Sequence, residues 1–507
     1  MKAFARSHNL ADDYRLISIL GGIFIALSVA FILRYPYVWA GLVALGLVVG
    51  VLSLTAKDFK TYWLAIFALV LPLEIKKMLI DSEPVRDFVQ TYGFPVGELP
   101  GPVLYLSDLP FLVLMIYWLF EVTFRKQKIF LPKSNLMALA FVIWSGVSLV
   151  NATVFSSGFF DLLRIVKFYL LYLYAANNFL SKKAVKTLIK FLLLGMILQG
   201  LLCLYQYLAQ DRGYILANLL GQQDLYTETA LKKVESLFSI TQEGAIRRGR
   251  GTVGPANAEA QYFEFLLPVA FLLWATATKF LSYSFNLTTF ILGLLGLIVT
   301  FSRGGLVGIT IGIVAVLLLS RWFQLISNKK LLTFCLIGLG LSTVISPIVY
   351  EYMITRPEAA SARLHLAKVG LEMVKAHPIL GVGLNNHLVL MPEYDPRSYA
   401  LPMPSHNQYI IIASEVGIPG LVFFLGFLAL TFRLALGAAR ADDLYIASVA
   451  VGILGALVSI ALHIQVDYLG TNTAMTLLWL YGGLAAALNQ WNAKPSEMTL
   501  KNENRAD

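Results

Sequence analysis

Charged residues are scarce in this chain, and their scarcity excludes a soluble globular protein. Asp, Glu, Lys and Arg make up only 14% of the 507 residues, whereas hydrophobic residues make up 58%. A soluble protein carries about a quarter charged residues. The mean hydropathy of +0.70 therefore requires much of the apolar surface to face lipid. We predict an all-α integral membrane protein.

Cysteines and the common catalytic motifs are also few or missing. The two cysteines, Cys203 and Cys335, lie inside apolar runs and predict small buried side chains, with no disulfide or metal framework. No Walker loop, no His-Glu-x-x-His metal helix and no Ser-His-Asp arrangement is visible. We therefore predict no metal site and no cofactor.

Long apolar runs predict about fourteen transmembrane helices of roughly 17–25 residues each. They lie near 16–33, 38–55, 61–80, 107–124, 136–154, 160–180, 187–209, 258–279, 286–301, 304–320, 331–349, 408–432, 444–466 and 472–490. Pro72 and Glu74 interrupt the third. No small-residue cleavage site follows the first run, which predicts a retained helix and no signal peptide. We interpret 1–507 as a single polytopic membrane domain.

Basic clusters alternate with the predicted helices in the way that sets membrane orientation. With the N-terminus inside, Lys182, Lys183 and Lys186 fall inside, and the short outer loops 151–158 and 467–471 carry no Lys or Arg. The long loops then predicted outside are 81–106, 210–257 and 350–407. Because these clusters indicate topology, the net charge of +10 predicts membrane lipids and no nucleic acid as partners.

The last long outer loop, 350–407, contains an amphipathic segment at 361–376. Its apolar residues broadly favour one side of a helix, while His365 and Lys368 lie on the other side and Pro378 ends the pattern. We predict a helix that lies on the outer membrane surface or against the bundle.

Arginines in three predicted outer elements are candidates for anion binding. Arg248 and Arg250 stand among glycines before a predicted span, where guanidinium groups and an open backbone suit a phosphate or diphosphate. A flexible basic loop near lipid headgroups is the alternative. Arg303 follows Ser302 between two spans, where it binds a ligand or snorkels to the interface. Arg363 opens the amphipathic helix, where a cation opposes the helix dipole and so hints at a ligand.

A histidine stands where the last long loop enters the membrane. His406 suits a general base whose tautomer Asn407 or a loop carbonyl fixes, and an interfacial histidine bonded to water is the alternative. Glu415 lies in the next span. Glu259 begins the span after the arginine-rich stretch, where polar side chains are expected to face a cavity. We interpret His377 as a cation at a helix end.

Two further polar clusters lie in or at the end of predicted spans. They are Asp161, Arg164 and Lys167 in one span, and His463, Gln465 and Asp467 at the outer end of another. Either cluster lines a cavity or pairs internally, and the sequence does not distinguish the two.

Over residues 190–430 the chain resembles the O-antigen ligase and polymerase family, which transfers lipid-linked glycans at bacterial membranes. Residues 248–257 resemble the element Arg-x-x-Gly-Thr-Phe-x-x-Pro-Asn, although Val253 replaces the aromatic residue and Ala256 separates Pro255 from Asn257. Residues 301–305 match the family element Ser-Arg-Gly. Arg363 with 377–383 matches an Arg followed by His-Pro-x-x-Gly-x-Gly. Residues 406–409 with 415–420 match His-Asn-x-x-Leu followed by Glu-x-Gly-x-x-Gly.

The resemblance implies a GT-C-like fold and a metal-independent, inverting glycosyltransferase in the bacterial cytoplasmic (inner) membrane, with its active site facing the periplasm. The implied partners are an undecaprenyl-diphosphate-linked oligosaccharide, an acceptor glycan or glycolipid, and a chain-length regulator. The implied diphosphate ligands are Arg248, Arg250, Arg303 and Arg363. His406 would be the catalytic base, and the implied supporting residues are Asn407, Glu415, Glu259 and Ser302.

The resemblance does not identify the acceptor of the glycan, so several functions stay open. The predicted number of spans favours a polymerase of surface polysaccharide, and the alternative is an O-antigen ligase that joins the glycan to lipid A core or another acceptor. A transporter of a small anion is the alternative from another class. Transporters place polar residues near the middle of broken spans, whereas the polar clusters here lie at outer ends and in outer loops.

Overall fold

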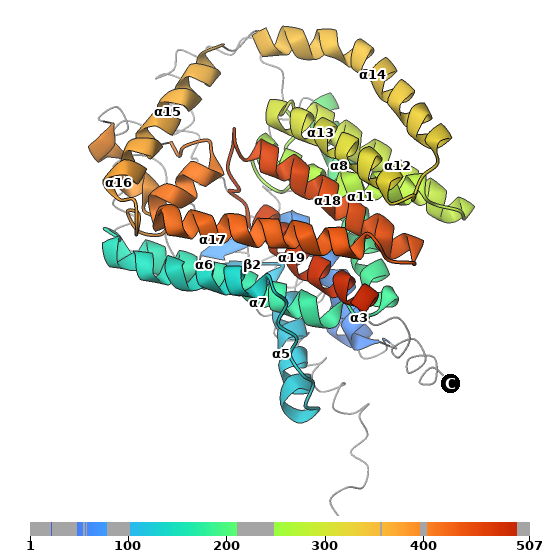
Figure 1. The fold of residues 1–507 in the computed structure, drawn as a ribbon, viewed down its shortest axis with the longest axis horizontal. Helices are drawn as coiled ribbons and strands as arrows, with labels where there is room; N and C mark the ends of the chain where they lie inside the picture. The colour runs from blue at the N-terminus through green and yellow to red at the C-terminus, as the bar shows by residue number, and fades with distance from the viewer. Residues whose placement is uncertain are drawn as a thin grey trace, which may run out of the picture.

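The computed structural model describes residues 22, 48–53, 56, 58–78, 102–209, 248–354, 357–395 and 403–493. Most of the predicted spans 16–33 and 38–55 and most of the loops 81–106 and 210–257 therefore lie outside the described residues. The described chain is mostly helical, as predicted (Figure 1). Its α-helices are α3 (Phe59–Val70), α5 (Asp108–Phe124), α6 (Asn135–Ser148), α7 (Phe155–Asn178), α8 (Lys182–Leu208), α11 (Ala256–Ala275), α12 (Phe280–Val299), α13 (Arg303–Trp322), α14 (Asn328–Ile354), α15 (Pro357–Ala376), α16 (His387–Tyr394), α17 (Gln408–Ala438), α18 (Leu444–His463) and α19 (Asn472–Ala493).

From the fourth onward, each predicted span coincides with one of these helices, with shifts at the ends. Five of them, α8, α12, α13, α17 and α18, are long and apolar enough by length and composition to cross a membrane. These helices are those of a multi-pass membrane protein. The count of about fourteen spans and the GT-C-like architecture stay predictions.

The third predicted span, 61–80, is wrong in its second half. Helix α3 ends at Val70 and passes into the 3₁₀ turn η1 (Leu71–Leu73), because Pro72 has no N–H to continue the helical ladder. The chain then forms strand β1 (Lys76–Met78), which pairs antiparallel with β2 (Val103–Tyr105). This two-stranded sheet was not predicted and closes one end of the bundle beside α5.

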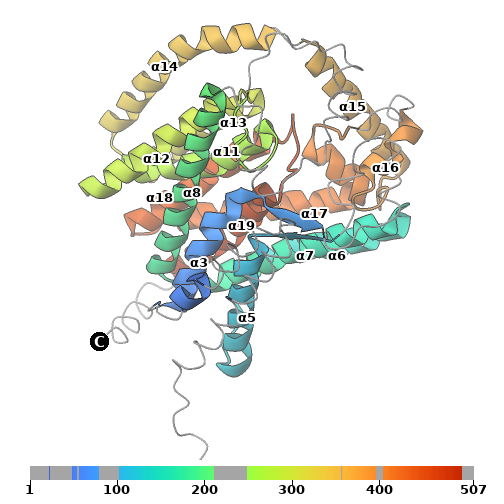
Figure 2. The same cartoon turned by 180° about the vertical axis from the view of Figure 1, so that it is seen from behind.

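Helix α11 forms the centre of the bundle. Nearly all of its side chains are buried, including the polar Glu259, Gln261 and Glu264. It packs against α8, α12, α13, α18 and α19, which surround it in both views (Figures 1 and 2). A carboxyl group in its first half therefore faces protein, and the expectation that these polar side chains face a cavity stays a prediction.

Helices α13 and α18 cross closely because small residues line their contact. A Cβ on Gly312 would lie 2.8 Å from the carbonyl oxygen of Gly455, and a Cβ on Gly455 would lie 3.0 Å from the carbonyl oxygen of Gly312. Gly308 and Gly304 continue this stripe towards the start of α13. Small residues at four-residue spacing allow membrane helices to approach backbone to backbone.

The two ends of the bundle carry different cations. Helix α8 runs from Lys182 at one end to Gln206 at the other, where Gln206 Oε1 accepts a hydrogen bond from the N–H of Arg250 at 2.9 Å. We call the end that carries Arg248, Arg303 and His406 the arginine end. The end that carries Lys182 is the lysine end.

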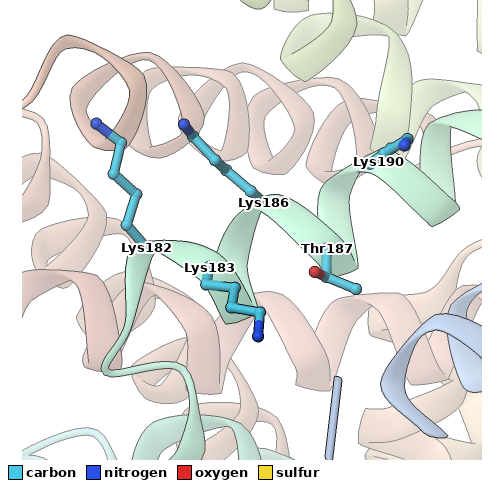
Figure 3. A pocket seen from close by; sticks show the side chains of 5 residues that line it. All are labelled: Lys182, Lys183, Lys186, Thr187 and Lys190. Carbon is cyan, nitrogen blue, oxygen red and sulfur yellow. The ribbon is translucent and has the colours of Figure 1, made fainter. Parts of the chain in front are cut away.

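A hollow at the lysine end is lined by Lys182, Lys183, Lys186, Thr187 and Lys190, all from the first turns of α8 (Figure 3). The lysine side chains fan out in different directions. The assignment of these lysines to the inner side of the membrane stays a prediction from the sequence.

Candidate functional site

Arg248 is held at the arginine end by groups from two other segments. Its Nε donates to the carbonyl oxygen of Thr300 at 2.5 Å, and its Nη2 donates to Asn257 Oδ1 at 2.6 Å. The N–H of Gly249 donates to the carbonyl oxygen of Val299 at 2.8 Å. The start of the arginine-rich stretch is therefore fixed by hydrogen bonds against the end of α12.

Arg250 and Glu259 lie on the other side of this loop. The N–H of Arg250 donates to Gln206, and its side chain is exposed. Glu259 is fully buried, and its Oε2 accepts from the N–H of Val253 at 3.1 Å. A Cβ on Gly251, whose φ is +55°, would lie 2.3 Å from Glu259 Oε2, so only glycine fits there. These contacts give Glu259 a part in shaping the loop.

Ser302 and Arg303 begin α13. Ser302 Oγ accepts from the N–H of Gly305 at 3.3 Å, which is an N-cap. Arg303 follows as the first helical residue and is half-buried. A Cβ on Gly304 would lie 2.8 Å from His463 Nε2, so the start of α13 lies directly on the end of α18. Ser302 is therefore the cap of the helix that Arg303 begins, and its supporting role in the site stays a prediction.

The amphipathic segment is helical and lies against the bundle. Helix α15 packs on α17 through Val369, Gly370 and Met373, which are buried. Leu364 and Leu371 are exposed, so the predicted apolar side was wrong for these two residues.

Arg363 lies in the second turn of α15, because the helix begins earlier than predicted, at Pro357. The argument that Arg363 opposes the helix dipole in the first turn is therefore wrong. Its charge nevertheless acts on the imidazoles of His406 and His463. The structure thus brings Arg363 to the arginine end from a distant part of the sequence.

One ring nitrogen of His406, Nδ1, makes a hydrogen bond to the protein backbone. Its Nδ1 lies 3.1 Å from the carbonyl oxygen of Pro404, which can only accept, so in the neutral ring Nδ1 carries the proton. Among the described residues, no group hydrogen-bonds Nε2. The ring packs edge to face on Tyr468, with 5.9 Å between centroids. The geometry therefore leaves an Nε2 lone pair to accept a proton.

The pKa of His406 lies below its ordinary value of 6.5. Burial lowers it, the charge of Arg363 lowers it further, and the carboxylate of Asp467 opposes both. The neutral form is therefore the main species at pH 7, as a general base requires.

Asn407 does not fix this tautomer, since the loop carbonyl of Pro404 does. Asn407 is the N-cap of α17, and its Oδ1 accepts from the N–H of Ile410 at 3.1 Å. Its Nδ2 donates to the carbonyl oxygen of Gln465 at 3.0 Å. Asn407 therefore anchors the start of α17 to the connection between α18 and α19.

Asp467 joins the separate elements. Its Oδ2 accepts from Asn257 Nδ2 at 2.6 Å, and Asn257 in turn holds Arg248. The same oxygen lies 3.9 Å from His463 Nε2, and its charge acts on His406. The sequence showed His463 and Asp467 as polar residues at a span end but assigned them no role, because their partners lie about two hundred residues away.

The elements 377–383 and 414–420 form one interlocked unit. The φ of +74° at Gly417 breaks the helical pattern of α17, and the N–H of Ile418 donates to the carbonyl oxygen of Pro378 at 2.8 Å. The carbonyl oxygen of Ser414 then accepts from the N–H of Val382 at 2.8 Å. Because Pro419 has no N–H, the carbonyl oxygen of Glu415 has no helical donor, and it accepts from the N–H of Gly383 at 3.0 Å.

Glu415 takes part in this unit and does not touch His406 through any described hydrogen bond. Its Oε1 accepts from the N–H of His387 at 3.4 Å. His377 follows the end of α15, and its carbonyl oxygen accepts from the N–H of Gly381 at 3.0 Å. The family-like elements around Glu415 and His377 therefore build the frame on which His406 is mounted.

His387 connects this frame to the segment before His406, and the sequence reasoning missed it. Its Nδ1 lies 2.7 Å from Ser414 Oγ, and its Nε2 accepts from the N–H of Ser405 at 3.3 Å. Burial lowers the pKa of His387 to about 4, so the ring is neutral at pH 7. No local pattern marks this residue, since its partners come from α17 and from the loop after α16.

The polar cluster of α7 pairs internally. Arg164 lies 2.6 Å from Asp161, and Lys167 lies 2.9 Å from Asp108 and 2.7 Å from Asn472 Oδ1. These contacts fix α7 to α5 and α19. Within the ranges that the structure describes, no group of three His, Cys, Asp or Glu side chains is arranged to hold a metal ion.

Comparison with known proteins agrees with the motifs. Residues 288–425 match the family model described as O-Antigen ligase, a range that includes Arg303, Arg363 and His406 but not Arg248. No curated protein matches the chain. The resemblance drawn from the order of the motifs is thus confirmed over residues 288–425, which are similar to the O-antigen ligase family, and the described helices are those of a multi-pass membrane protein.

Proposed function

We propose that this protein moves a glycan from undecaprenyl diphosphate to a sugar hydroxyl of an acceptor, at the periplasmic face of the bacterial inner membrane. The observation that carries the proposal is the placement of Arg248, Arg303 and Arg363 at the same end of the bundle as His406, whose Nε2 has no hydrogen-bond partner within the described residues. An arginine cluster recognises a diphosphate, and an open imidazole nitrogen accepts a proton.

The donor diphosphate would bind to Arg248, Arg303 and Arg363. The carbonyl oxygen of Thr300 and the amide of Asn257 hold the Arg248 guanidinium in place, which supports its assignment as a diphosphate ligand. Arg250, whose side chain is exposed at the edge of the same loop, would meet the glycan-bearing end of the donor or assist the diphosphate. These groups would stabilise the negative charge that grows on the diphosphate as it leaves.

His406 would act on the acceptor. Nε2 takes the proton of the attacking hydroxyl while the hydroxyl oxygen forms a bond to the anomeric carbon. The bond from that carbon to the diphosphate oxygen breaks, and the diphosphate leaves with the electron pair. A single displacement of this kind inverts the anomeric centre. The proton then passes from the half-exposed imidazole to water.

We favour a polymerase, in which the acceptor is another lipid-linked repeat unit. Ligation to lipid A core or another acceptor is the second candidate, and the description of the matching family model, O-Antigen ligase, favours it. Both reactions need the same donor site and the same base. They differ in the acceptor alone.

The test is transfer by the purified protein in liposomes that contain an undecaprenyl-diphosphate-linked repeat unit from its own host. A ladder of products that His406→Ala abolishes supports a polymerase, and one larger product that requires a separate lipid acceptor supports a ligase. His365→Ala is the matched control. The Nε2 of His365 lies 2.7 Å from Asp395 Oδ2, so this imidazole is engaged in a pair that does not include His406. No product in either assay, with intact donor, would refute the proposal and favour the transporter.

A further inference from the structure

Two carboxyl groups and an imidazole are buried together where α11, α13 and α18 meet. Glu264, His463 and Asp467 are all buried, and none of them has a part in the mechanism above. Buried charges in a membrane protein are costly and are retained where they serve a function.

His463 lies between the two carboxyl groups. Its Nδ1 makes a short hydrogen bond to Glu264 Oε2, and its Nε2 faces Asp467 Oδ2 at 3.9 Å. Because both ring nitrogens face carboxyl oxygens, the geometry suits an imidazolium that donates on both sides. His463 therefore differs from His406, since both of its ring nitrogens face carboxyl oxygens.

The glycines of α13 make room for this pair. A Cβ on Gly308 would lie 2.2 Å from Glu264 Oε1, and a Cβ on Gly304 would lie 2.5 Å from His463 Cδ2. Ser459 Oγ donates to Glu264 Oε1 at 2.6 Å and completes the surroundings. The first turn of α13, which begins with Arg303, thus lies directly on the imidazole.

Two lines of contact lead from His463 to the arginines. One is the first turn of α13, which begins with Arg303. The other runs through Asp467 to Asn257 at 2.6 Å and from Asn257 to Arg248 at 2.6 Å. A change at His463 therefore reaches both arginines.

We infer that Glu264 and His463 form a positioning pair that holds Arg248 and Arg303 in register for a lipid diphosphate. The inference rests on the proposed function, since it deepens the same site. The pair touches no reacting atom and acts through Asp467, Asn257 and the first turn of α13.

The test measures binding of farnesyl diphosphate, a short prenyl diphosphate, to the purified full chain in detergent. We expect His463→Gln to raise the dissociation constant about tenfold, which is about 1.4 kcal/mol. Glu264→Gln with His463→Gln should bind more tightly than His463→Gln alone, because the double variant leaves no buried carboxylate without its cation. If His463→Gln does not fold, the double variant is compared with the unaltered protein instead: weaker binding by the folded double variant is expected, and unchanged binding would overturn the inference.

The matched control is Thr276→Val. Thr276 Oγ1 and Ser448 Oγ lie 3.0 Å apart and join the same two helices, α11 and α18, at the lysine end. This variant should bind farnesyl diphosphate like the unaltered protein. If it weakens binding as much as His463→Gln, the pair only holds the helices together and the inference is overturned.

A double-mutant cycle with Arg248→Lys separates positioning from general destabilisation. If His463 acts largely through Arg248, the two changes together should cost less than the sum of their single effects, whereas Thr276→Val and Arg248→Lys should add. Full additivity of His463→Gln would overturn the inference. Failure of the unaltered protein to bind the probe at all would instead contradict the proposed function, so the two failures are distinguishable.

Discussion

Cations gather at both ends of the bundle, but their partners differ. At the lysine end, Lys183 lies 2.9 Å from the carboxylate of Asp58, and Lys182 is paired with Asp443. At the arginine end, the hydrogen bonds of Arg248 go to a backbone carbonyl and an amide. Carboxylates neutralise a cation, whereas neutral acceptors orient it and keep its charge. These contacts thus tie Lys182 and Lys183 to carboxylates that cap helices, whereas those of Arg248 hold it to neutral groups of two other segments, as expected for the diphosphate site proposed above.

The acids of the lysine end are themselves helix caps. Asp58 accepts from the N–H of Thr61 at 3.0 Å and begins α3, and Asp443 begins α18 in the same way. Burial alone would raise the pKa of Asp58, but these hydrogen bonds and the charge of Lys183 lower it overall. The lysine end is therefore a set of local contacts, whereas the arginine end depends on contacts between distant segments.

The largest expected difference between the two ends is in transfer activity. We expect Arg303→Ala to lower the transfer rate in liposomes about 10²–10³-fold, because one preorganised charge donor is lost. Lys186→Ala should leave the rate unchanged, because Lys186 lies over the ring of Tyr445 at the far end. Equal losses in the two variants would show that the arginine end has no special part in transfer.

The frame of the arginine end should tolerate no side chain at Gly417. A Cβ there would lie 1.9 Å from the carbonyl oxygen of Ile379, and φ is +74°. We expect Gly417→Ala to cost about 3–4 kcal/mol of stability, measured by thermal unfolding in detergent. Gly340→Ala is the control, since nothing lies within 4 Å of its Cβ position. A stable Gly417→Ala protein would contradict the interlock between the two motif elements.

The arginine end should also lose stability in acid through His387. Its pKa is about 4 in the folded protein and about 6.5 in the unfolded chain, so the unfolded chain binds the proton more readily. The stabilisation is complete above pH 6.5 and falls by about 3 kcal/mol as the pH drops towards 4. Unfolding measured from pH 7 to pH 4.5 tests this sign, and His387→Gln should flatten the dependence.

A smaller effect is expected in the pH dependence of transfer. Since the pKa of His406 is lowered, the rate should rise with pH through a value below 6.5 and then stay level. Arg363→Ala removes a charge that lowers this pKa, so the rising limb should move to higher pH. An unchanged limb in the variant would show that His406 is not the group that titrates.

The smallest effect is expected at the lysine end. Lys183 is largely exposed and Asp58 is partly exposed, so Lys183→Ala should change stability by at most about 1 kcal/mol. Transfer should not change. A loss of several kcal/mol in the free energy of unfolding would contradict the view that the lysine end depends on weak local contacts.

Apolar periodicity predicted the helices well, because a membrane helix needs a continuous apolar run wherever its neighbours lie. Pro72 marks the limit of this reasoning, since the chain leaves the helix there for a 3₁₀ turn and a strand that pairs across a loop. The start of α15 was also misplaced, which removed the dipole argument for Arg363. Ends of helices depend on contacts that periodicity does not contain.

By itself, the sequence determined the membrane class and the family resemblance over residues 288–425, and it singled out the arginines and His406 as candidates, because these depend on composition and on the order of short motifs. Only the tertiary structure decided which motif residues face the site and which build its frame. Glu415 and the glycines around it interlock two backbone segments, and Asp467, His387 and His463 acquire partners from distant helices. Hydrogen bonds of this kind are set by where the helices meet, and no local pattern in the chain specifies that.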